Sequence, residues 1–266
     1  MSKPVLATDL DGTLIPMGEY PENVTDLQEL KTRLREQEAT VIFVTGRFLE
    51  SIQAAIGEFD LPVPDWIIAD VGTSIYEHRG DLKYEPLSSY QDYQAEITEP
   101  FPIAKLREEL AEIPGLLPQE EEKQGRFKLS YYAPADQLDA LAAQTAKIVK
   151  QLAAPYSIIQ SLDPHGEEGF LDFLPRSISK AHALNFWHEH VDRDPERTVF
   201  SGDSGNDLAA LTAGYRSIVV GNAEAKLADK VQAAHTEAGW TDRLHLAERA
   251  ATSGVLEGCH RFGMFG

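Results

Sequence analysis

The feature that most constrains the fold lies near the N-terminus, where an apolar run is followed at once by two aspartates and a glycine. Residues 5–8 have the length and composition of a buried strand, and Asp9-Leu10-Asp11-Gly12-Thr13 continues directly from it. The glycine ends the strand and allows Asp11 to lie over Asp9. Two carboxylates this close repel each other and need a bound cation or a shared proton. A simple polar turn is the alternative, because Asp-Gly is a common turn dipeptide, and these residues alone do not separate the two.

The order of strand, polar loop and helix then recurs along the chain. Residues 40–44 predict a strand that ends in Thr45-Gly46-Arg47, before a helix over 49–59, and residues 66–71 predict a third strand. An amphipathic helix over 23–38 connects the first two strands. Its apolar face is predicted to consist of Val24, Leu27, Leu30 and Leu34. This alternation predicts a parallel sheet with right-handed crossovers, whose loops gather at the edge where ligands bind.

Beyond Tyr76 the pattern changes, and residues 85–172 predict an inserted α+β domain. Its predicted elements are a helix over 103–113, a short strand near Leu116, a strand over 127–133, a helix over 135–151, and strands over 156–162 and 169–174. From Lys180 the α/β alternation resumes and ends in two helices, around 225–232 and 243–251. We therefore predict an α/β fold with a Rossmann-like doubly wound parallel sheet. Its core domain comprises residues 1–84 and 173–266, split by the insertion.

Acidic residues strongly outnumber basic ones, with 43 Asp and Glu against 24 Lys and Arg and a net charge of −19. Such a chain repels nucleic acid and anionic membranes, so we expect neither as a partner. An anionic substrate must then be held by a local cluster of cations, a metal ion or helix N-termini. The absence of an apolar run of about 18 residues and of a signal-like start favours the cytoplasm. The single cysteine, Cys259, excludes an internal disulfide.

A second dense polar stretch, Gly202-Asp203-Ser204-Gly205-Asn206-Asp207, directly follows a predicted strand over 198–201. Its two aspartates are four residues apart at a helix start, so they can face the same way. Helix capping by Asp203 or Ser204 explains one of these residues. It does not explain two acids at the sheet edge that also holds Asp9. Magnesium prefers hard oxygen ligands, and carboxylates from two strand ends supply them.

Four such segments occur in order, and together they resemble the haloacid dehalogenase-like phosphohydrolases. The matching segments are Asp9-Leu10-Asp11-Gly12-Thr13, Thr45-Gly46-Arg47, Lys180 and Gly202-Asp203-Ser204-Gly205-Asn206-Asp207. The resemblance implies catalysis through an aspartyl phosphate. Asp9 is then the nucleophile, Asp11 the general acid and later the general base, and Lys180 cancels phosphate charge.

The resemblance also implies a Mg²⁺ cofactor, held by Asp9, the backbone carbonyl of Asp11 and Asp203, with Asp207 behind these ligands. The phosphoryl group and substrate are then bound by the segment Thr45-Gly46-Arg47, in which the Thr45 hydroxyl donates to a phosphoryl oxygen. Asn206 orients Lys180 or the phosphate.

The insertion resembles the α+β cap domains of sugar-phosphate phosphatases, and finer likeness points to the sucrose-phosphate phosphatase family. That likeness lies in Gln124-Gly125-Arg126-Phe127-Lys128-Leu129-Ser130-Tyr131-Tyr132, Val71-Gly72-Thr73-Ser74-Ile75-Tyr76, Leu171-Asp172-Phe173-Leu174-Pro175 and Gly221-Asn222-Ala223. It implies a phosphoric monoester hydrolase that converts sucrose 6-phosphate to sucrose and phosphate. Lys128 then reaches from the cap to the substrate.

Two alternatives remain open at this point. Glucosyl- or mannosyl-3-phosphoglycerate carries a carboxylate and needs another cation, and Arg47, Arg126 and Lys128 could serve either substrate class. A non-catalytic sugar-phosphate-binding module that partners a sucrose-phosphate synthase is the other alternative. Otherwise we expect a monomer that takes a small-molecule sugar phosphate.

Two residues depart from the family pattern: Phe48 stands where a small residue is expected and Ala181 where glycine is expected. Both put the identity of the sugar in question more than the reaction. The roles of Arg126, His165 and Asn222 stay open at this point.

Overall fold

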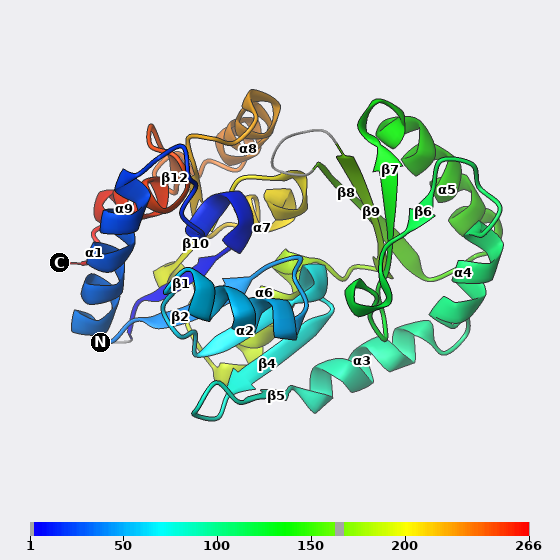
Figure 1. The fold of residues 1–266 in the computed structure, drawn as a ribbon, viewed down its shortest axis with the longest axis horizontal. Coiled ribbons are helices and arrows are strands. Elements are labelled where there is room, and N and C mark those ends of the chain that lie inside the picture. Colours follow the sequence, from blue (N-terminus) through cyan, green and yellow to red (C-terminus); the bar gives the residue numbers. More distant parts are fainter. Residues whose placement is uncertain (1–2, 163–167, 266) are drawn as a thin grey trace.

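The computed structural model describes residues 3–162 and 168–265, and within them two sheets and the helices that cover them form the fold (Figure 1). The larger sheet has eight strands, in the spatial order β12 (Leu244–Leu246), β11 (Arg216–Val219), β10 (Thr198–Gly202), β1 (Val5–Thr8), β2 (Thr40–Val44), β3 (Trp66–Ala69), β4 (Ser74–His78) and β5 (Tyr84–Pro86). The smaller sheet has four, in the order β6 (Leu117–Pro118), β7 (Leu129–Pro134), β9 (Glu168–Pro175) and β8 (Tyr156–Leu162). We call them the core sheet and the cap sheet.

The helices that cover these sheets follow the strands in chain order. They are α1 (Glu22–Glu36), α2 (Leu49–Glu58), α3 (Ser88–Thr98), α4 (Ile103–Leu110), α5 (Leu138–Gln151), α6 (Lys180–Val191), the short α7 (Leu208–Leu211), α8 (Ala225–Glu237) and α9 (Ala251–Arg261). Among the described residues, no helix has the length and apolar composition needed to span a bilayer.

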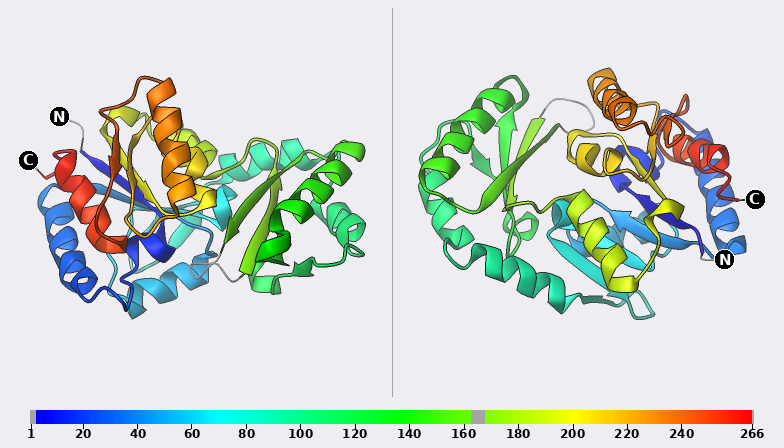
Figure 2. Two further views of the ribbon diagram at one scale, coloured as in Figure 1. Left: turned by 90° about the horizontal axis from the view of Figure 1, so that it is seen from above. Right: turned by 180° about the vertical axis from the view of Figure 1, so that it is seen from behind.

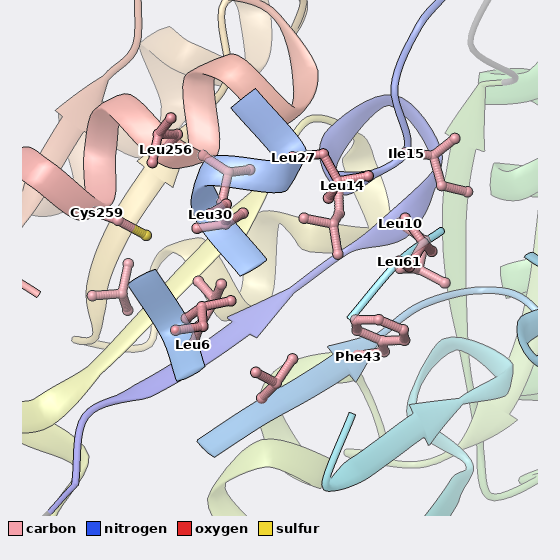
Figure 3. Packing of buried hydrophobic residues seen from close by; sticks show 14 of the residues in the cluster. Leu6, Leu10, Leu14, Ile15, Leu27, Leu30, Phe43, Leu61, Leu256 and Cys259 are labelled. Atoms are coloured by element: carbon pink, nitrogen blue, oxygen red, sulfur yellow. The ribbon is translucent and has the colours of Figure 1, made fainter. Parts of the chain in front are cut away.

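The core sheet is doubly wound, as the sequence predicts. Its strands from β12 to β3 are parallel, and β4 and β5 add an antiparallel edge. Alternate residues of each strand enter opposite layers: Leu6 packs with α1, α2 and α9, whereas Val5 and Ala7 pack with α6, α7 and α8. Figure 3 shows the first of these layers, including the buried Cys259 against the sheet. Burial on both faces explains why these strands are continuous apolar runs.

The cap sheet is wholly antiparallel, with α4 and α5 packed on one face around Leu106, Leu141 and Phe173. In both views of Figure 2 this unit lies beside the core, at the opposite end from the two termini. The prediction of an inserted α+β unit is thus confirmed in its secondary structure. The exact domain division at 84/85 and 172/173 remains a proposal, because β5 and β9 each cross one of these positions.

Three local predictions are corrected. The predicted closing helix over 243–251 is wrong, because this segment contains strand β12 and the helix begins at Ala251. Helix α3 was not predicted, and the third strand ends at Ala69, so that Asp70–Gly72 forms a tight turn. On α1, Val24 is 59% exposed. Its neighbour Asn23 is buried instead and donates from Nδ2 to Ala250 O and Ser253 Oγ.

Candidate active site

The carboxyl ends of β1, β10, β2 and β3 bring the predicted site residues to one edge of the core sheet. Strand β1 lies between β2 and β10, so the loops that follow β1 and its two neighbours lead to opposite sides of the sheet at this point. Ligands bind at such a switch point in open α/β sheets. Asp9 follows β1 and Asp203 follows β10, and the Asp9 amide still donates to Ser201 O (3.0 Å).

Lys180 lies at the centre of this edge and is fully buried. Its Nζ is 2.7 Å from Asp207 Oδ1 and 3.1 Å from Asp9 Oδ1. The first residue of α6 is held there because Ser179 caps the helix, accepting from the His182 amide. Burial alone would lower the pKa of Lys180, but Asp207 and Asp9 together raise it above its ordinary value. Lys180 is therefore a fixed positive charge beside Asp9.

The acidic side chains around Lys180 lie as close together as metal ligands do. One carboxylate oxygen from each of Asp9, Asp203 and Asp207 lies within 4.8 Å of the others. We call these three residues and Lys180 the core cluster. Burial, opposed by Lys180 and reinforced by the neighbouring carboxylates, raises the pKa of Asp9 well above its ordinary value. Burial and then Asp207 raise the pKa of Asp203 to about 7. A divalent cation would relieve this repulsion, so the donor set fits Mg²⁺.

The loop after Asp9 is built to approach Asp203 closely. Gly12 has φ +70°, and a Cβ there would lie 2.4 Å from Asp203 Oδ2. Thr13 Oγ1 donates to Asp203 Oδ1 (2.7 Å). Asn222, to which the sequence assigned no role, holds this loop: its Nδ2 donates to Gly12 O (2.8 Å), and its Oδ1 accepts from the Ala251 amide.

Asp207 differs from the other two acids because both of its oxygens are already committed. Oδ1 contacts Lys180, and Oδ2 accepts from the amides of Asp203 and Ser204 (3.1 Å each). Ser204 caps the following turn reciprocally, so the capping interpretation is correct for this residue. Asp207 thus holds the loop and Lys180 in place, and its position behind the metal ligands stays a prediction.

Asp11 and Arg47 form a bidentate ion pair, with Nε 2.7 Å from Oδ2 and Nη2 2.6 Å from Oδ1. Arg47 also donates to Ser51 Oγ (3.2 Å). Arg47 was predicted as a substrate ligand, yet its guanidinium holds Asp11 in this structure. The fork geometry fixes the orientation of the Asp11 carboxylate.

Thr45, Gly46 and Asn206 lie at the same edge. Thr45 is buried, and its Oγ1 accepts from the Arg47 amide (3.2 Å). A Cβ at Gly46 would lie 3.9 Å from Asn206 Nδ2, so the second and fourth motifs meet here. Half-buried Phe48 precedes α2, and Ala181 packs beneath the sheet in the α6 layer.

Lys128 is only 3% exposed, and its Nζ lies 2.9 Å from Oδ1 of Asp70, on the turn after β3. Buried Asp172 of β9 lies nearby and accepts from Ser130 Oγ (2.5 Å). We call Asp70, Lys128 and Asp172 the cap cluster. Sequence reasoning did not identify Asp70 or Asp172 as site residues. Asp70 could have been noticed, because a single acidic residue at the end of an apolar strand often lies at a ligand-binding edge. Arg126 is exposed and stacks on the Phe127 ring, and His165 lies outside the described residues.

The cap touches the core cluster's own loop. A Cβ at Gly205 would lie 2.7 Å from Gln160 O of β8, so any larger residue there would force the backbone of one of the two segments to move. The absence of a side chain at Gly205 therefore permits close approach of β8 to this loop.

Comparison with known proteins identifies the family of the chain. The sequence model described as sucrose-6F-phosphate phosphohydrolase matches residues 2–263. A HAD-like hydrolase of Nitrosococcus oceani is 39% identical over 84% of this chain, which spans 60% of that protein's length. Mannosylfructose-phosphate phosphatase of Agrobacterium fabrum is 29% identical over 98% of this chain and 97% of its own length.

Among solved structures, the sucrose-phosphatase of Synechocystis sp. PCC6803, in complex with sucrose and phosphate, superposes with a TM-score of 0.82. It covers 99% of both chains at 23% sequence identity. This similarity supports the doubly wound core and the inserted cap as one shared fold.

Proposed function

The chain belongs to the sucrose-6F-phosphate phosphohydrolase family, and on that premise we propose that it is a Mg²⁺-dependent phosphatase of sugar phosphates. The observation that carries this proposal is the core cluster, in which Asp9 lies 3.1 Å from the Lys180 ammonium and within reach of Asp203. We propose sucrose 6-phosphate as the substrate. Mannosylfructose phosphate is the second candidate, because the relative named for it matches nearly the whole chain.

Catalysis begins with Asp9. Its carboxylate oxygen forms a bond to phosphorus while the bond between phosphorus and the sugar oxygen breaks, and the leaving oxygen takes a proton from Asp11. A water molecule then attacks the aspartyl phosphate and gives a proton to Asp11. Inorganic phosphate leaves, and the Asp9 carboxylate is restored. Arg47 holds both Asp11 carboxylate oxygens in this structure, so Asp11 acts in these steps once one oxygen leaves the ion pair to carry the proton.

Charge compensation is the second requirement, because a phosphate dianion repels a carboxylate nucleophile. Lys180 supplies one fixed positive charge, and we propose that Thr45 and Asn206 donate to phosphoryl oxygens. Asp9, Asp203 and the Asp11 backbone carbonyl would hold Mg²⁺, which neutralises phosphoryl charge when bound. Asp207 keeps Lys180 and the loop in position.

Phosphate release with Mg²⁺ tests the proposal across sucrose 6-phosphate, mannosylfructose phosphate, the two 3-phosphoglycerate glycosides, glucose 6-phosphate and mannose 6-phosphate. We expect the highest kcat/KM for sucrose 6-phosphate. A preference for mannosylfructose phosphate would keep the chemistry and change the sugar. The absence of phosphate release from every compound of the panel would contradict the proposal and favour a sugar-phosphate-binding module. An association with a sucrose-phosphate synthase and a monomeric state remain predictions, for which pull-down and light scattering are the measurements.

A further inference from the structure

The cap cluster joins two parts of the chain at the edge of the core sheet. Asp70 follows β3, where its amide donates to Arg47 O (3.0 Å) and the next amide donates to Thr45 O (3.1 Å). Lys128 comes from the cap and places its ammonium 2.9 Å from Asp70. The cluster therefore lies beside the Thr45 and Arg47 loop, on the side that faces the cap.

The backbone holds Asp70 in a conformation that a free turn would avoid. Asp70 has φ +54° and Val71 has φ +58°, both in the left-handed region that β-branched residues rarely adopt. The Asp70 carbonyl accepts from the amide of Thr73 (3.2 Å) and from its hydroxyl (3.0 Å). Strain of this kind persists where the surroundings over-determine it, and it is concentrated at functional sites. The Asp70 carboxylate is thus held at a fixed place.

The charges of this cluster leave no excess cation. One ammonium lies among two buried carboxylates. Burial raises the pKa of Asp70, and Lys128 opposes the shift; the same two causes act in this order on Asp172. Lys180 contributes least to the shift in the pKa of Asp172, which it lowers.

We propose that Asp70 determines substrate specificity by taking up the charge of Lys128, so that the cap accepts an uncharged sugar and disfavours one that carries a carboxylate. This inference rests on the proposed function and names its substrate class. Lys128 keeps donor capacity for sugar hydroxyls. Asp70 Oδ2 accepts from Ser74 Oγ at 3.3 Å, a long hydrogen bond that leaves capacity for a second donor.

The other basic residues considered for a substrate carboxylate are committed elsewhere in the described structure. Arg47 is held by both oxygens of Asp11, and Arg126 is exposed over the Phe127 ring, outside the buried cap cluster. Lys180 is enclosed by two aspartates of the core cluster. A carboxylated sugar would therefore bring its charge against Asp70 without a free partner, and an unpaired charge in a buried site is costly.

Binding and turnover together test the inference. Calorimetry with Mg²⁺ would compare sucrose 6-phosphate with glucosyl-3-phosphoglycerate on the Asp9→Asn chain, with and without Asp70→Asn. Steady-state kinetics would compare the same two ligands as substrates of the chain that retains Asp9. We expect Asp70→Asn to raise the affinity for the carboxylated ligand relative to the neutral one at least tenfold, through KM more than kcat. Glu112→Gln, an exposed cap residue with the same loss of charge, should leave the ratio unchanged.

Asp172→Asn provides a second variant that retains side-chain shape, and it should shift the ratio in the same direction. The inference would be overturned if both variants fold and their ratio of affinities for the carboxylated and the neutral ligand stays within twofold of the parent chain's ratio. A parent chain that binds the carboxylated ligand more tightly would also overturn it. If the parent binds the neutral ligand selectively and the variants shift the ratio, yet nothing is hydrolysed, then the inference holds and the proposed function fails.

Discussion

The core cluster and the cap cluster each bury one lysine among aspartates, but they differ in how the charge is balanced. In the core cluster two carboxylates contact Lys180, and their oxygens converge with one of Asp203 within 4.8 Å. In the cap cluster two carboxylates accompany Lys128, and among the described residues the only converging acidic group is the one in the core. The core arrangement favours a divalent cation, whereas in the cap arrangement Asp70 is paired with Lys128.

The difference shows that a buried Lys–Asp pair is not by itself a sign of catalysis. What distinguishes the core cluster is excess negative charge placed where two parallel strands end, next to the loop that contains Asp11. What distinguishes the cap cluster is an ion pair between segments of different sheets, which is suited to recognition. Each prediction below changes one cluster and leaves the other intact.

Asp9→Asn should have the largest effect. Removing the proposed nucleophile should lower kcat by about 10⁴-fold or more, in line with the loss seen when a covalent catalyst is removed. The fold should persist, because the substitution also removes a carboxylate that Asp203 and Asp207 repel. Steady-state kinetics and circular dichroism measure both. Asp229→Asn, exposed on α8, is the matched control. A near-normal rate would exclude Asp9 as the nucleophile.

Variants of Asp203 and Asp207 should distinguish a residue that binds the metal from one that supports the loop. Asp203→Asn should raise the Mg²⁺ concentration for half-maximal activity by about 10–100-fold, with little loss of stability. Asp207→Asn should instead lower Tm by about 6 °C or more, because it breaks a fully buried pair and its amide group would face the amides of Asp203 and Ser204. Mg²⁺ titration and thermal melts of both variants are the measurements. Interchanged phenotypes would show that Asp207 is the metal ligand.

Lys128→Ala should act on recognition more than on chemistry. We expect KM for the preferred sugar phosphate to rise about tenfold, equivalent to about 1.4 kcal/mol of binding, with a smaller change in kcat. Lys150→Ala, an exposed lysine of the cap helix α5, should change neither. If KM and kcat of Lys128→Ala both matched the parent enzyme, the cap cluster would have no part in substrate binding.

The sequence predicted the core cluster well because each of its members lies directly after a strand or at a helix start. In a parallel sheet these positions meet at one edge whatever the details of packing. Asp9, Asp203 and Asp207 could therefore be assembled from local pattern, whereas Lys180, which follows a strand of the cap sheet, was identified only through the family resemblance. Their roles stay predictions, since geometry shows proximity and not turnover.

The cap cluster could not be assembled in this way. Asp70 continues an apolar run and is typical of the end of a strand, and its partner Lys128 comes from a separate sheet. Helix α3 was missed because its buried stripe is polar: Tyr90, Gln94 and Thr98 recur at helical spacing, and Gln94 donates to Thr73 O. Tertiary partners, which the local sequence does not contain, decide such positions.

Helix α9 was misplaced for a related reason. It contains Gly254 and Gly258, which lower helix propensity, so the helix was predicted before them. A Cβ at Gly258 would lie 2.4 Å from Ile218, and a Cβ at Gly254 would lie 2.3 Å from Arg249 O. Both glycines are needed because the helix lies close against β11 and the preceding turn.

Asp70→Asn should have the smallest effect, on the pH dependence of stability. Burial raises the pKa of Asp70 above its ordinary value near 3.8, so the folded chain holds this proton more tightly than the unfolded chain does. The stabilisation from this group is complete below about pH 4 and is lost as pH rises through the raised pKa. The amide that replaces the carboxyl group in this variant cannot titrate, so Tm should fall less between pH 4 and pH 7 than in the parent chain, by about 2 °C. The difference should be the same with and without Mg²⁺, because Asp70 is paired with Lys128. Parallel curves for parent and variant would contradict the raised pKa, and a difference that Mg²⁺ abolishes would mean that the two clusters do not differ in their need for a cation.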